Sequence, residues 1–343
     1  MYIIKQLPED FVVTEISNVK LKLVGKYQYY KIIKKNRNTL DVIKQLAKIL
    51  HCKEKEIGFA GSKDRRAITE QVISMQNVKK EKVLSLTIDN VSLKFLGYGD
   101  EPLTLGQLQG NYFEIVVRNI EKKIKIEKIK LVENYFDEQR FGRHNVKIGK
   151  FLLKKQFSEA VKLIEDTRMK AYLEHHKNDF IGALKLLPVR HLKMYVNAYQ
   201  SFLWNETVAE FLNEKGKKTK ETIYSQGKLI FAGNTVDFAE EKIPLLGFDF
   251  QETKKPWGEI ISSLLQKENL SPSDFIIKQI PELTAEGELR QVVVEVKDLS
   301  IGNLQDDELN QGMKKVKLTF SLPKGSYATM VVRKIFTPFY FRS

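Results

Sequence analysis

One carboxylate stands among three cations in the segment Gly58 to Gln71, which reads GFAGSKDRRAITEQ. Asp64 follows Lys63 and precedes Arg65 and Arg66. Cations beside an acid favour its ionised form, which suits a nucleophile or a base better than a general acid. The same cations could instead form an ordinary solvated turn, or bind phosphate groups.

The order of residues around Asp64 differs from that of the common phosphate-binding loops. A Walker loop has a glycine ahead of a Gly-Lys-Ser/Thr run, whereas here the lysine follows Ser62 and precedes an aspartate that would repel phosphate. The run from Gly97 to Glu101 begins like a dinucleotide fingerprint, but Pro102 occupies the place of the third glycine and no matching βαβ pattern follows. We therefore expect no nucleotide cofactor.

Composition narrows the classes of protein that remain. With 343 residues, of which 42% are hydrophobic, the chain is long enough for two domains or for one large domain with an insertion. The formal charge of +14 is typical of a protein that binds a polyanion, although lysines that serve only solubility would also produce it. An anionic membrane surface is less favoured, because no basic amphipathic helix stands out.

The sequence predicts no disulfide, metal site or membrane segment. Cys52 is a single cysteine, and the pair His175 and His176 has no further ligand at zinc spacing. No run approaches the roughly 18 apolar residues of a membrane span, and the amino terminus becomes charged too early for a signal peptide. We expect a cytoplasmic protein without a metal.

Strands and one helix are predicted around the Asp64 segment. Residues 11–16 and 110–118 resemble strands, and a short strand leads from Ile57 into the loop. Apolar residues at helical spacing predict a helix over residues 38–50, with Asn38 or Thr39 as its N-cap. A lysine-rich helix is expected after Arg118. A carboxylate at the end of a strand is well placed for chemistry.

The sequence pattern in the middle of the chain is more helical. Residues 191–216 carry apolar and aromatic side chains at helical spacing and end at Gly216, which predicts a long amphipathic helix. Strand-like sequence returns at 290–296 and 316–334, where the run LPKGSYAT is expected to form a turn and the start of a strand. Strands at both ends and a more helical middle predict an α+β core with an inserted domain.

Several motifs follow one another along the chain in a characteristic order. GFAGSKDRRAITEQ is followed by GNYFEIVVR (110–118), NYFDEQRFGR (134–143), AYQSFLWNE (198–206) and FSLPKGSYATMVVR (320–333), and IIKQLPEDFVVTE (3–15) precedes them all. Their order and rough spacing strongly resemble the TruD family of RNA pseudouridine synthases. The resemblance covers essentially the whole chain.

The resemblance implies roles for particular residues. Asp64 corresponds to the catalytic aspartate of the family's Gly-x-Lys-Asp-x-x-Ala-x-Thr-x-Gln motif. Phe113 corresponds to the phenylalanine of its Asn-x-Phe motif, which stacks on the target base. Asn111 of that motif is expected to hydrogen-bond or to shape the site. Lys5 is expected to pair with Asp64, and Lys63 to support the site.

Five basic residues are candidates for contacts with RNA phosphates. Arg65 and Arg66 flank Asp64, Arg140 and Arg143 lie in the third motif, and Lys324 lies in the last. Capping or packing at a domain junction is an equally good interpretation of Arg140 and Arg143.

The implied fold is α+β. A mixed, mostly antiparallel sheet of the pseudouridine synthase type would be formed by residues 1–130 and 290–343, and a large α/β (TRUD) domain would be inserted at 131–289. The implied activity is the isomerisation of uridine 13 of tRNA to pseudouridine, by a monomer that needs neither metal nor organic cofactor. Two alternatives stay open, namely the same chemistry at another RNA site and a non-catalytic RNA-binding or RNA-folding protein on this scaffold.

The chain departs from the family's pattern at two points. Asp137 stands where the family often has glycine, and Lys334 follows Arg333 where the family often has glutamate. Neither departure touches the Asp64 motif, but both could alter the domain junction.

Overall fold

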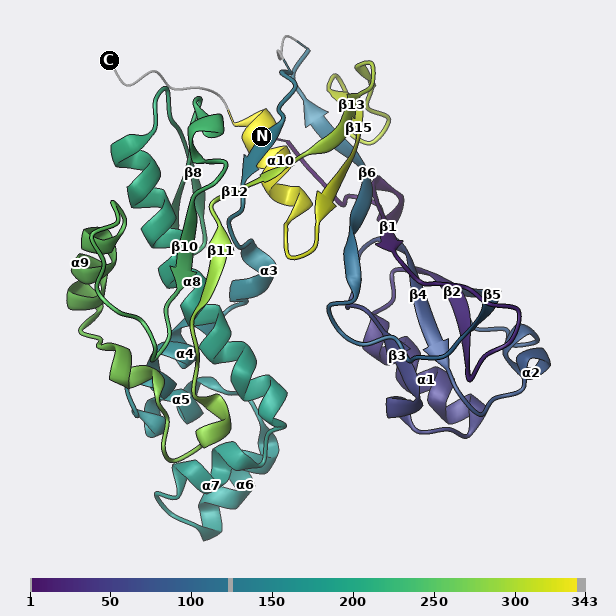
Figure 1. Cartoon of the computed structure of the whole chain (residues 1–343), viewed down its shortest axis with the longest axis horizontal. Helices are drawn as coiled ribbons and strands as arrows, with labels where there is room; N and C mark the ends of the chain where they lie inside the picture. The colour runs from purple at the N-terminus through teal and green to yellow at the C-terminus, as the bar shows by residue number, and fades with distance from the viewer. Residues whose placement is uncertain (1, 123–125, 338–343) are drawn as a thin grey trace. The chain divides into compact units, whose positions relative to one another are not determined.

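The computed structural model of the chain describes residues 2–122 and 126–337. They divide into two compact units, coloured by residue number in Figure 1. Unit 1 consists of Met1–Lys130 and Glu295–Ala328, and unit 2 of Leu131–Val294 and the residues from Thr329 onward. Unit 1 is therefore discontinuous in the sequence.

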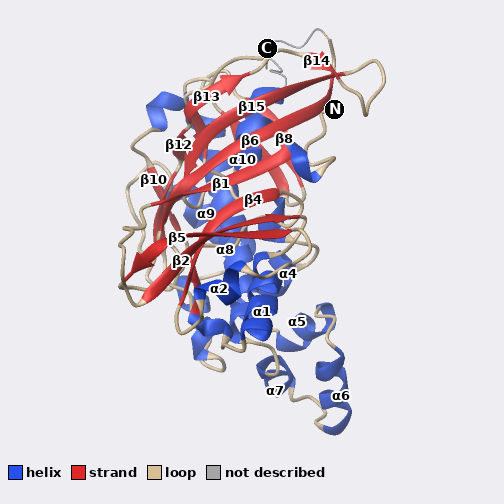
Figure 2. Cartoon of the chain, turned by 90° about the vertical axis from the view of Figure 1, so that its right-hand side faces the viewer, coloured by secondary structure: helices blue, strands red, loops and turns tan. Residues whose placement is uncertain are grey.

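Unit 1 is built on a nine-stranded sheet. Its strands follow one another in the order β13-β15-β6-β1-β4-β2-β5 (Figure 2). In addition, β14 is paired to β15 and β3 is paired to β4. The strands are β1 (Phe11–Ser17), β2 (Tyr27–Lys35), β3 (Ile57–Phe59), β4 (Ile68–Met75), β5 (Val91–Gly99), β6 (Leu108–Ile120), β13 (Lys297–Ile301), β14 (Gln305–Asp306) and β15 (Lys314–Pro323). Strands β1 and β4 run parallel, whereas the neighbouring pairs β1–β6, β2–β4 and β6–β15 are antiparallel. The predicted mixed, mostly antiparallel sheet is confirmed.

A row of neighbouring side chains crosses five of these strands on one face of the sheet. Lys34 on β2 is paired with Thr69 on β4, and Thr69 is also paired with Val13 on β1. Val13 is paired with Phe113 on β6, which in turn is paired with Phe320 on β15. Paired residues project to the same side of a sheet, so these side chains share a face. Residues two positions away along each strand project to that face as well.

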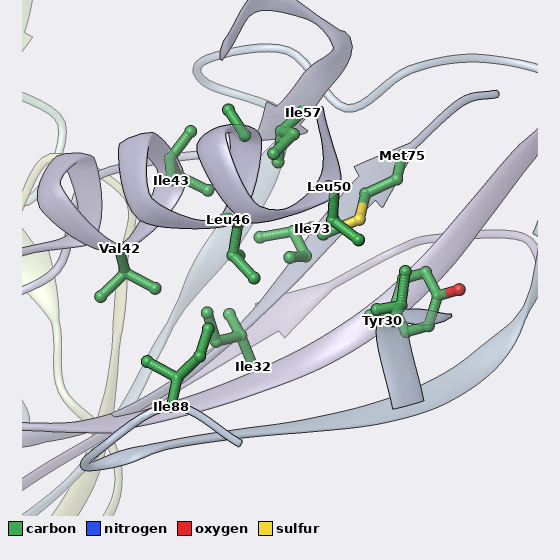
Figure 3. Close-up of a cluster of buried hydrophobic side chains, with 12 residues drawn as sticks. Tyr30, Ile32, Val42, Ile43, Leu46, Leu50, Ile57, Ile73, Met75 and Ile88 are labelled. Atoms are coloured by element: carbon green, nitrogen blue, oxygen red, sulfur yellow. The ribbon is translucent and has the colours of Figure 1, made fainter. Parts of the chain in front are cut away.

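Helix α1 (Thr39–Leu50) covers the part of this face formed by β2 and β4. Leu46 is fully buried and points from α1 toward Ile32 and Ile73 of the sheet (Figure 3). The side chain of Asn38 accepts a hydrogen bond from the Leu40 amide at 3.1 Å and caps the helix, as the sequence predicts. Packing against the sheet and the cap at Asn38 therefore hold α1 in place. The short helix α2 (Lys80–Leu84) and the 3₁₀ turns η1 (Pro8–Asp10) and η2 (Glu54–Glu56) complete unit 1.

Unit 2 contains the long helix α8 (Val189–Lys215), which ends at Gly216 as predicted. Trp204 of α8 is fully buried, and its indole donates to the Ile243 carbonyl at 3.0 Å. The other helices are α3 (Glu138–Phe141), α4 (Asn145–Leu153), α5 (Phe157–Leu163), α6 (Thr167–His175), α7 (Phe180–Lys185), α9 (Gly258–Glu268) and α10 (Ala328–Phe336), with the 3₁₀ turns η3 (Thr235–Phe238), η4 (Pro272–Phe275) and η5 (Pro281–Leu283). The strands form the pairs β8 (Lys220–Tyr224) with β9 (Gly227–Phe231), β10 (Lys242–Leu245) with β11 (Glu288–Gln291), and β7 (Leu131–Glu133) with β12 (Val293–Glu295). Unit 2 thus combines helices with short strands.

The lysine-rich helix predicted after Arg118 is wrong for the described residues. Strand β6 continues to Ile120, where it is paired with Lys314 of β15, and residues 126–130 are not helical. Pairing with β15 supplies hydrogen-bond partners to this end of β6 and so favours strand over helix up to Ile120.

The strand predicted to start in LPKGSYAT is also wrong. Gly325 turns the chain with a φ of +79°, and the residues after it form α10. Val331 and Val332 favour strands locally, but together with Ala328 and Ile335 they lie at helical spacing and are buried. Burial of one helix face therefore outweighs the local preference of β-branched residues for strands.

Candidate active site

The loop that carries Asp64 joins β3 to β4 and contacts the first turn of α1. The side-chain amide of Gln71 donates to the Gly61 carbonyl at 3.0 Å, and the Thr39 hydroxyl accepts from the Lys63 amide at 3.1 Å. The same hydroxyl donates to Oε1 of Gln71 at 3.1 Å, so the two side chains hold each other as well as the loop. The backbone is therefore fixed immediately ahead of Asp64.

A buried lysine binds the backbone at Asp64 itself. The Nζ atom of Lys34 donates to the carbonyl oxygens of Asp64 at 2.9 Å, of Arg37 at 2.7 Å and of Lys63 at 3.5 Å. Lys34 is only 1% exposed. Burial lowers the pKa of its ammonium to about 8, which the negative charge of Asp64 opposes and the positive charge of Lys63 reinforces. Lys34 is thus predominantly protonated at neutral pH.

The carboxylate of Asp64 is accessible and has a cation beside it. Its side chain is 24% exposed, and the Nζ atom of Lys5 lies 3.2 Å from Oδ2. Lys5 adopts a φ of +57°, which is uncommon for a residue with a side chain. Its ammonium also lies 4.0 Å from the centroid of the Phe11 ring, a cation–π contact. The structure therefore brings Lys5 and Asp64 together, as the resemblance implies.

Lys63 directs its charge to a different carboxylate. Its Nζ atom lies 2.6 Å from Oε2 of Glu15, and the two side chains are 5% and 0% exposed. The other oxygen of Glu15 accepts from the Val72 amide at 3.3 Å. The buried pair joins the Asp64 loop to β1. Lys63 consequently acts on the site by holding the loop.

Phe113 lies in an aromatic cluster. Its ring centroid is 6.2 Å from that of Phe11 and 5.6 Å from that of Phe320, and the residue is 5% exposed. This is the burial of a core residue. A base could stack on the ring only after a neighbouring side chain moves aside.

Asn111 projects to the same face of β6 as Phe113, two positions away. Its Oδ1 atom is buried and has no hydrogen-bond partner among the described residues. A buried acceptor without a donor is energetically costly, and such atoms often await a ligand or water. Asn111 can therefore accept one hydrogen bond from a bound molecule.

The predicted phosphate contacts in unit 1 are exposed. Arg65 and Arg66 lie on the Asp64 loop, where Arg66 donates to the Gln6 carbonyl at 3.4 Å. Lys324 is also exposed, and its Nζ atom donates to the Gly106 carbonyl at 2.9 Å. Their side chains can reach solvent and hence a polyanion.

The two candidate arginines of unit 2 differ in their surroundings. The Nε atom of Arg140 donates to the Ser201 hydroxyl at 3.0 Å, and its guanidinium lies 5.5 Å from the centroid of the Phe136 ring. Arg143 is exposed. Arg140 therefore has a packing role within unit 2, whereas Arg143 is accessible from solvent.

Asp137, which departs from the family's glycine, is buried and accepts a hydrogen bond from the Thr329 hydroxyl at 2.7 Å. Arg333 lies 3.7 Å from its other oxygen. The aspartate thus links its segment to α10 within unit 2.

Sequence reasoning did not identify Lys34, Thr39 or Glu15 as parts of the site. Lys34 carries a usable signal, because it continues the inward series of Tyr30 and Ile32 along β2, where a hydrophobic residue would be expected. A lysine at an inward position needs partners. Thr39 and Glu15 carry no comparable signal, since a helix start and a strand residue are ordinary places for them.

The described residues offer neither a metal cluster nor a membrane-spanning helix. In the part of the chain that the structure describes, no three His, Cys, Asp or Glu side chains are grouped so that they could hold a metal ion. None of the described helices is both long enough and apolar enough to cross a bilayer.

Comparison with known proteins identifies the family. The sequence profile of the family described as tRNA pseudouridine synthase D (TruD) matches residues 2–171 and 163–335. The chain belongs to the TruD family. The enzymes of this family are tRNA pseudouridine synthases, which are isomerases.

Individual TruD proteins match the chain over nearly its whole length. A tRNA pseudouridine synthase D of Aquifex aeolicus is 33% identical over 97% of this chain and 97% of that protein. A Methanococcus maripaludis protein assigned to the same activity is 32% identical over 97% and 98% of the two chains. A crystal structure assigned to TruD of Methanosarcina mazei is 26% identical, with a TM-score of 0.70 over 98% of this chain and 93% of that one. The match confirms the fold class of this TruD protein.

Proposed function

We propose that this TruD protein converts a uridine of tRNA, at position 13, to pseudouridine, and that Asp64 is its catalytic group. The observation that carries the proposal is the carboxylate of Asp64, which is accessible, lies 3.2 Å from a cation and sits on a loop with a fixed backbone. The motif around Asp64 and the family supply the target. Because the proposed substrate is tRNA, the proposed compartment is the cytoplasm.

The reaction places specific demands on that carboxylate. The bond from N1 of the base to C1′ of the ribose breaks, the base turns, and a bond from C5 to C1′ forms. The proton on C5 leaves to solvent and N1 gains a proton, so atoms and charge balance without any redox partner. An ionised carboxylate near the base and sugar can add to the base, attack C1′ or remove a proton from the sugar. Lys5 keeps a positive charge beside this group in each case.

The base would be held by residues on the same face of the sheet. A flipped uracil loses its stacking in RNA and needs both a flat apolar surface and hydrogen-bond partners. We propose Phe113 as the stacking surface, reached when a neighbouring side chain moves aside. We propose that the unpartnered Oδ1 of Asn111 accepts a hydrogen bond from the base.

Phosphate contacts would supply most of the affinity. The exposed Arg65, Arg66 and Lys324 of unit 1 and Arg143 of unit 2 are the proposed contacts, and Arg140 contributes less because its guanidinium already packs within unit 2. Binding should weaken steeply with salt, since each phosphate contact releases a counterion.

The test is tritium release from unmodified tRNA transcripts labelled at uridine C5, followed by mapping of the modified position. The variant is Asp64→Asn, which keeps the shape of the side chain and removes its charge. Asp41→Asn, an exposed aspartate on α1, is the matched control. We expect release with wild type and the control, none with Asp64→Asn, and RNA affinity within about threefold throughout.

The outcomes separate the alternatives. Activity in Asp64→Asn would refute the role of the aspartate. Release that maps to another nucleotide would keep the chemistry and change the target. Tight binding of tRNA without release by wild type would favour another RNA substrate or a non-catalytic RNA-binding protein.

A further inference from the structure

We propose that Lys34 is a positioning residue of the active site, whose ammonium holds the backbone of Asp64 in the catalytic position. The inference rests on the proposed function of Asp64 and concerns how the chain keeps that residue in place. Lys34 lies 30 residues before Asp64 in the sequence, on the inward side of β2.

The ammonium of Lys34 has as many hydrogen-bond acceptors around it as it has donors. An ammonium group has three donors and no acceptor. The carbonyl oxygens of Arg37, Asp64 and Lys63 lie 2.7, 2.9 and 3.5 Å from Nζ. Two of these carbonyls belong to the catalytic loop, and the third belongs to the connection between β2 and α1. Lys34 therefore links the loop to the start of α1.

Burial separates this role from direct catalysis. At 1% exposure Lys34 cannot contact a nucleotide, so its effect on the reaction must pass through the residues it binds. Among the described residues, its hydrogen-bond partners are carbonyl oxygens and not carboxylates. A buried charge kept without a paired carboxylate is costly to a fold. We infer that a lysine is present at this position, despite that cost, because its hydrogen bonds fix the geometry of the loop.

Other contacts hold the residues on either side of Asp64 in the loop. Thr39 and Gln71 hold Lys63 and Gly61, which precede Asp64. After Asp64, the carbonyl of Ala67 accepts a hydrogen bond from the Asn36 amide at 3.0 Å. Removal of the Lys34 ammonium would therefore take away the hydrogen bond to the Asp64 carbonyl while the contacts at both ends of the loop remain.

The experiment compares Lys34→Met, which keeps the length of the side chain and removes its donors, with Lys34→Arg, which keeps charge and donors. Lys35→Met is the control, because Lys35 is the next residue of β2 and is exposed on the opposite face. Each full-length variant is assayed for kcat and KM on labelled tRNA. Hydrogen exchange of the free protein is measured for peptides covering the Asp64 loop and α1.

We expect Lys34→Met to lower kcat by about 100-fold, because a misplaced catalytic group costs that order of rate, with KM within about threefold. Amides of the loop should exchange faster while those of α1 keep their protection. Lys34→Arg should recover at least about tenfold of the lost kcat, since guanidinium also donates to carbonyls. Lys35→Met should resemble wild type in every measurement.

Three results would overturn the inference. The first is a wild-type kcat in Lys34→Met, and the second is a lowered kcat in Lys34→Met with unchanged hydrogen exchange in the loop. The third is faster exchange throughout unit 1 in both Lys34 variants, because that result would indicate a purely structural lysine. Failure of the proposed function has a different signature. In that case wild type itself releases no tritium or Asp64→Asn stays active, whereas the exchange of the loop still reports whether Lys34 holds it.

Discussion

The buried ion pair between Lys63 and Glu15 offers a quantitative test of how the catalytic loop is attached to the sheet. The two charged groups are 2.6 Å apart, with side chains 5% and 0% exposed. Removing one partner leaves the other charge buried and without its ionic partner. Removing both leaves no such charge, so the effects of the two substitutions should not add.

The magnitude follows from the distance. At an effective dielectric constant of about 20, two unit charges separated by 2.6 Å attract by about 332/(20 × 2.6), or ~6 kcal/mol. Desolvation of both groups offsets much of this attraction in the intact pair. The loss of one partner from such a pair costs about 3–5 kcal/mol. We expect Lys63→Met and Glu15→Gln each to lower the free energy of unfolding of unit 1 by that amount, with a coupling energy of about 3 kcal/mol in the double variant.

Hydrogen exchange can measure the double-mutant cycle of Lys63 and Glu15 within unit 1 alone. Both tryptophans, Trp204 and Trp257, lie in unit 2, so their fluorescence does not report on the sheet of unit 1. Peptides from β1 and β4 report on unit 1, and peptides from α8 serve as an internal reference. A coupling of ~3 kcal/mol corresponds to a factor of about 150 in protection. Additive effects of the two single variants would refute the reasoning, as would equal loss of protection in α8.

Two more predictions concern the stability of unit 1. Leu46→Ala should lower the free energy of unfolding of unit 1 by about 2–5 kcal/mol, because it leaves a cavity between α1 and the sheet. The control Leu84→Ala, at an exposed position, should cost under about 1 kcal/mol. Urea denaturation followed by hydrogen exchange of β4 compares the two variants, and equal costs would contradict the packing argument. Burial raises the pKa of Asp307, but hydrogen bonds from Asn119 and Arg118 are among those that outweigh it and lower the pKa to about 2. The stabilisation by Asp307 should therefore be complete above its unfolded pKa of about 3.9 and be lost as the pH falls toward 2. Acid unfolding followed by circular dichroism tests this, and a curve as steep for Asp307→Asn as for wild type would contradict the prediction.

The sequence by itself determined the features that depend on local pattern. Helices α1 and α8 follow from apolar residues at helical spacing, with Asn38 and Gly216 at their ends. The ordered motifs identify the TruD family and place Asp64 in a loop after a short strand. These features are readable because capping and periodicity involve neighbours in the sequence.

Only the tertiary structure decided which side chains surround Asp64. Lys5 is 59 residues from Asp64 in the sequence, and the parallel pairing of β1 with β4 brings together the segments that precede these two strands. Lys63, although adjacent to Asp64, turns to Glu15, because a buried carboxylate attracts it more strongly than an exposed one. Lys34 belongs to the site because β2 faces inward at that point, and strand pairing decides which face is inward. Distances across a sheet are set by pairing between distant segments, a property that no local pattern of residues contains.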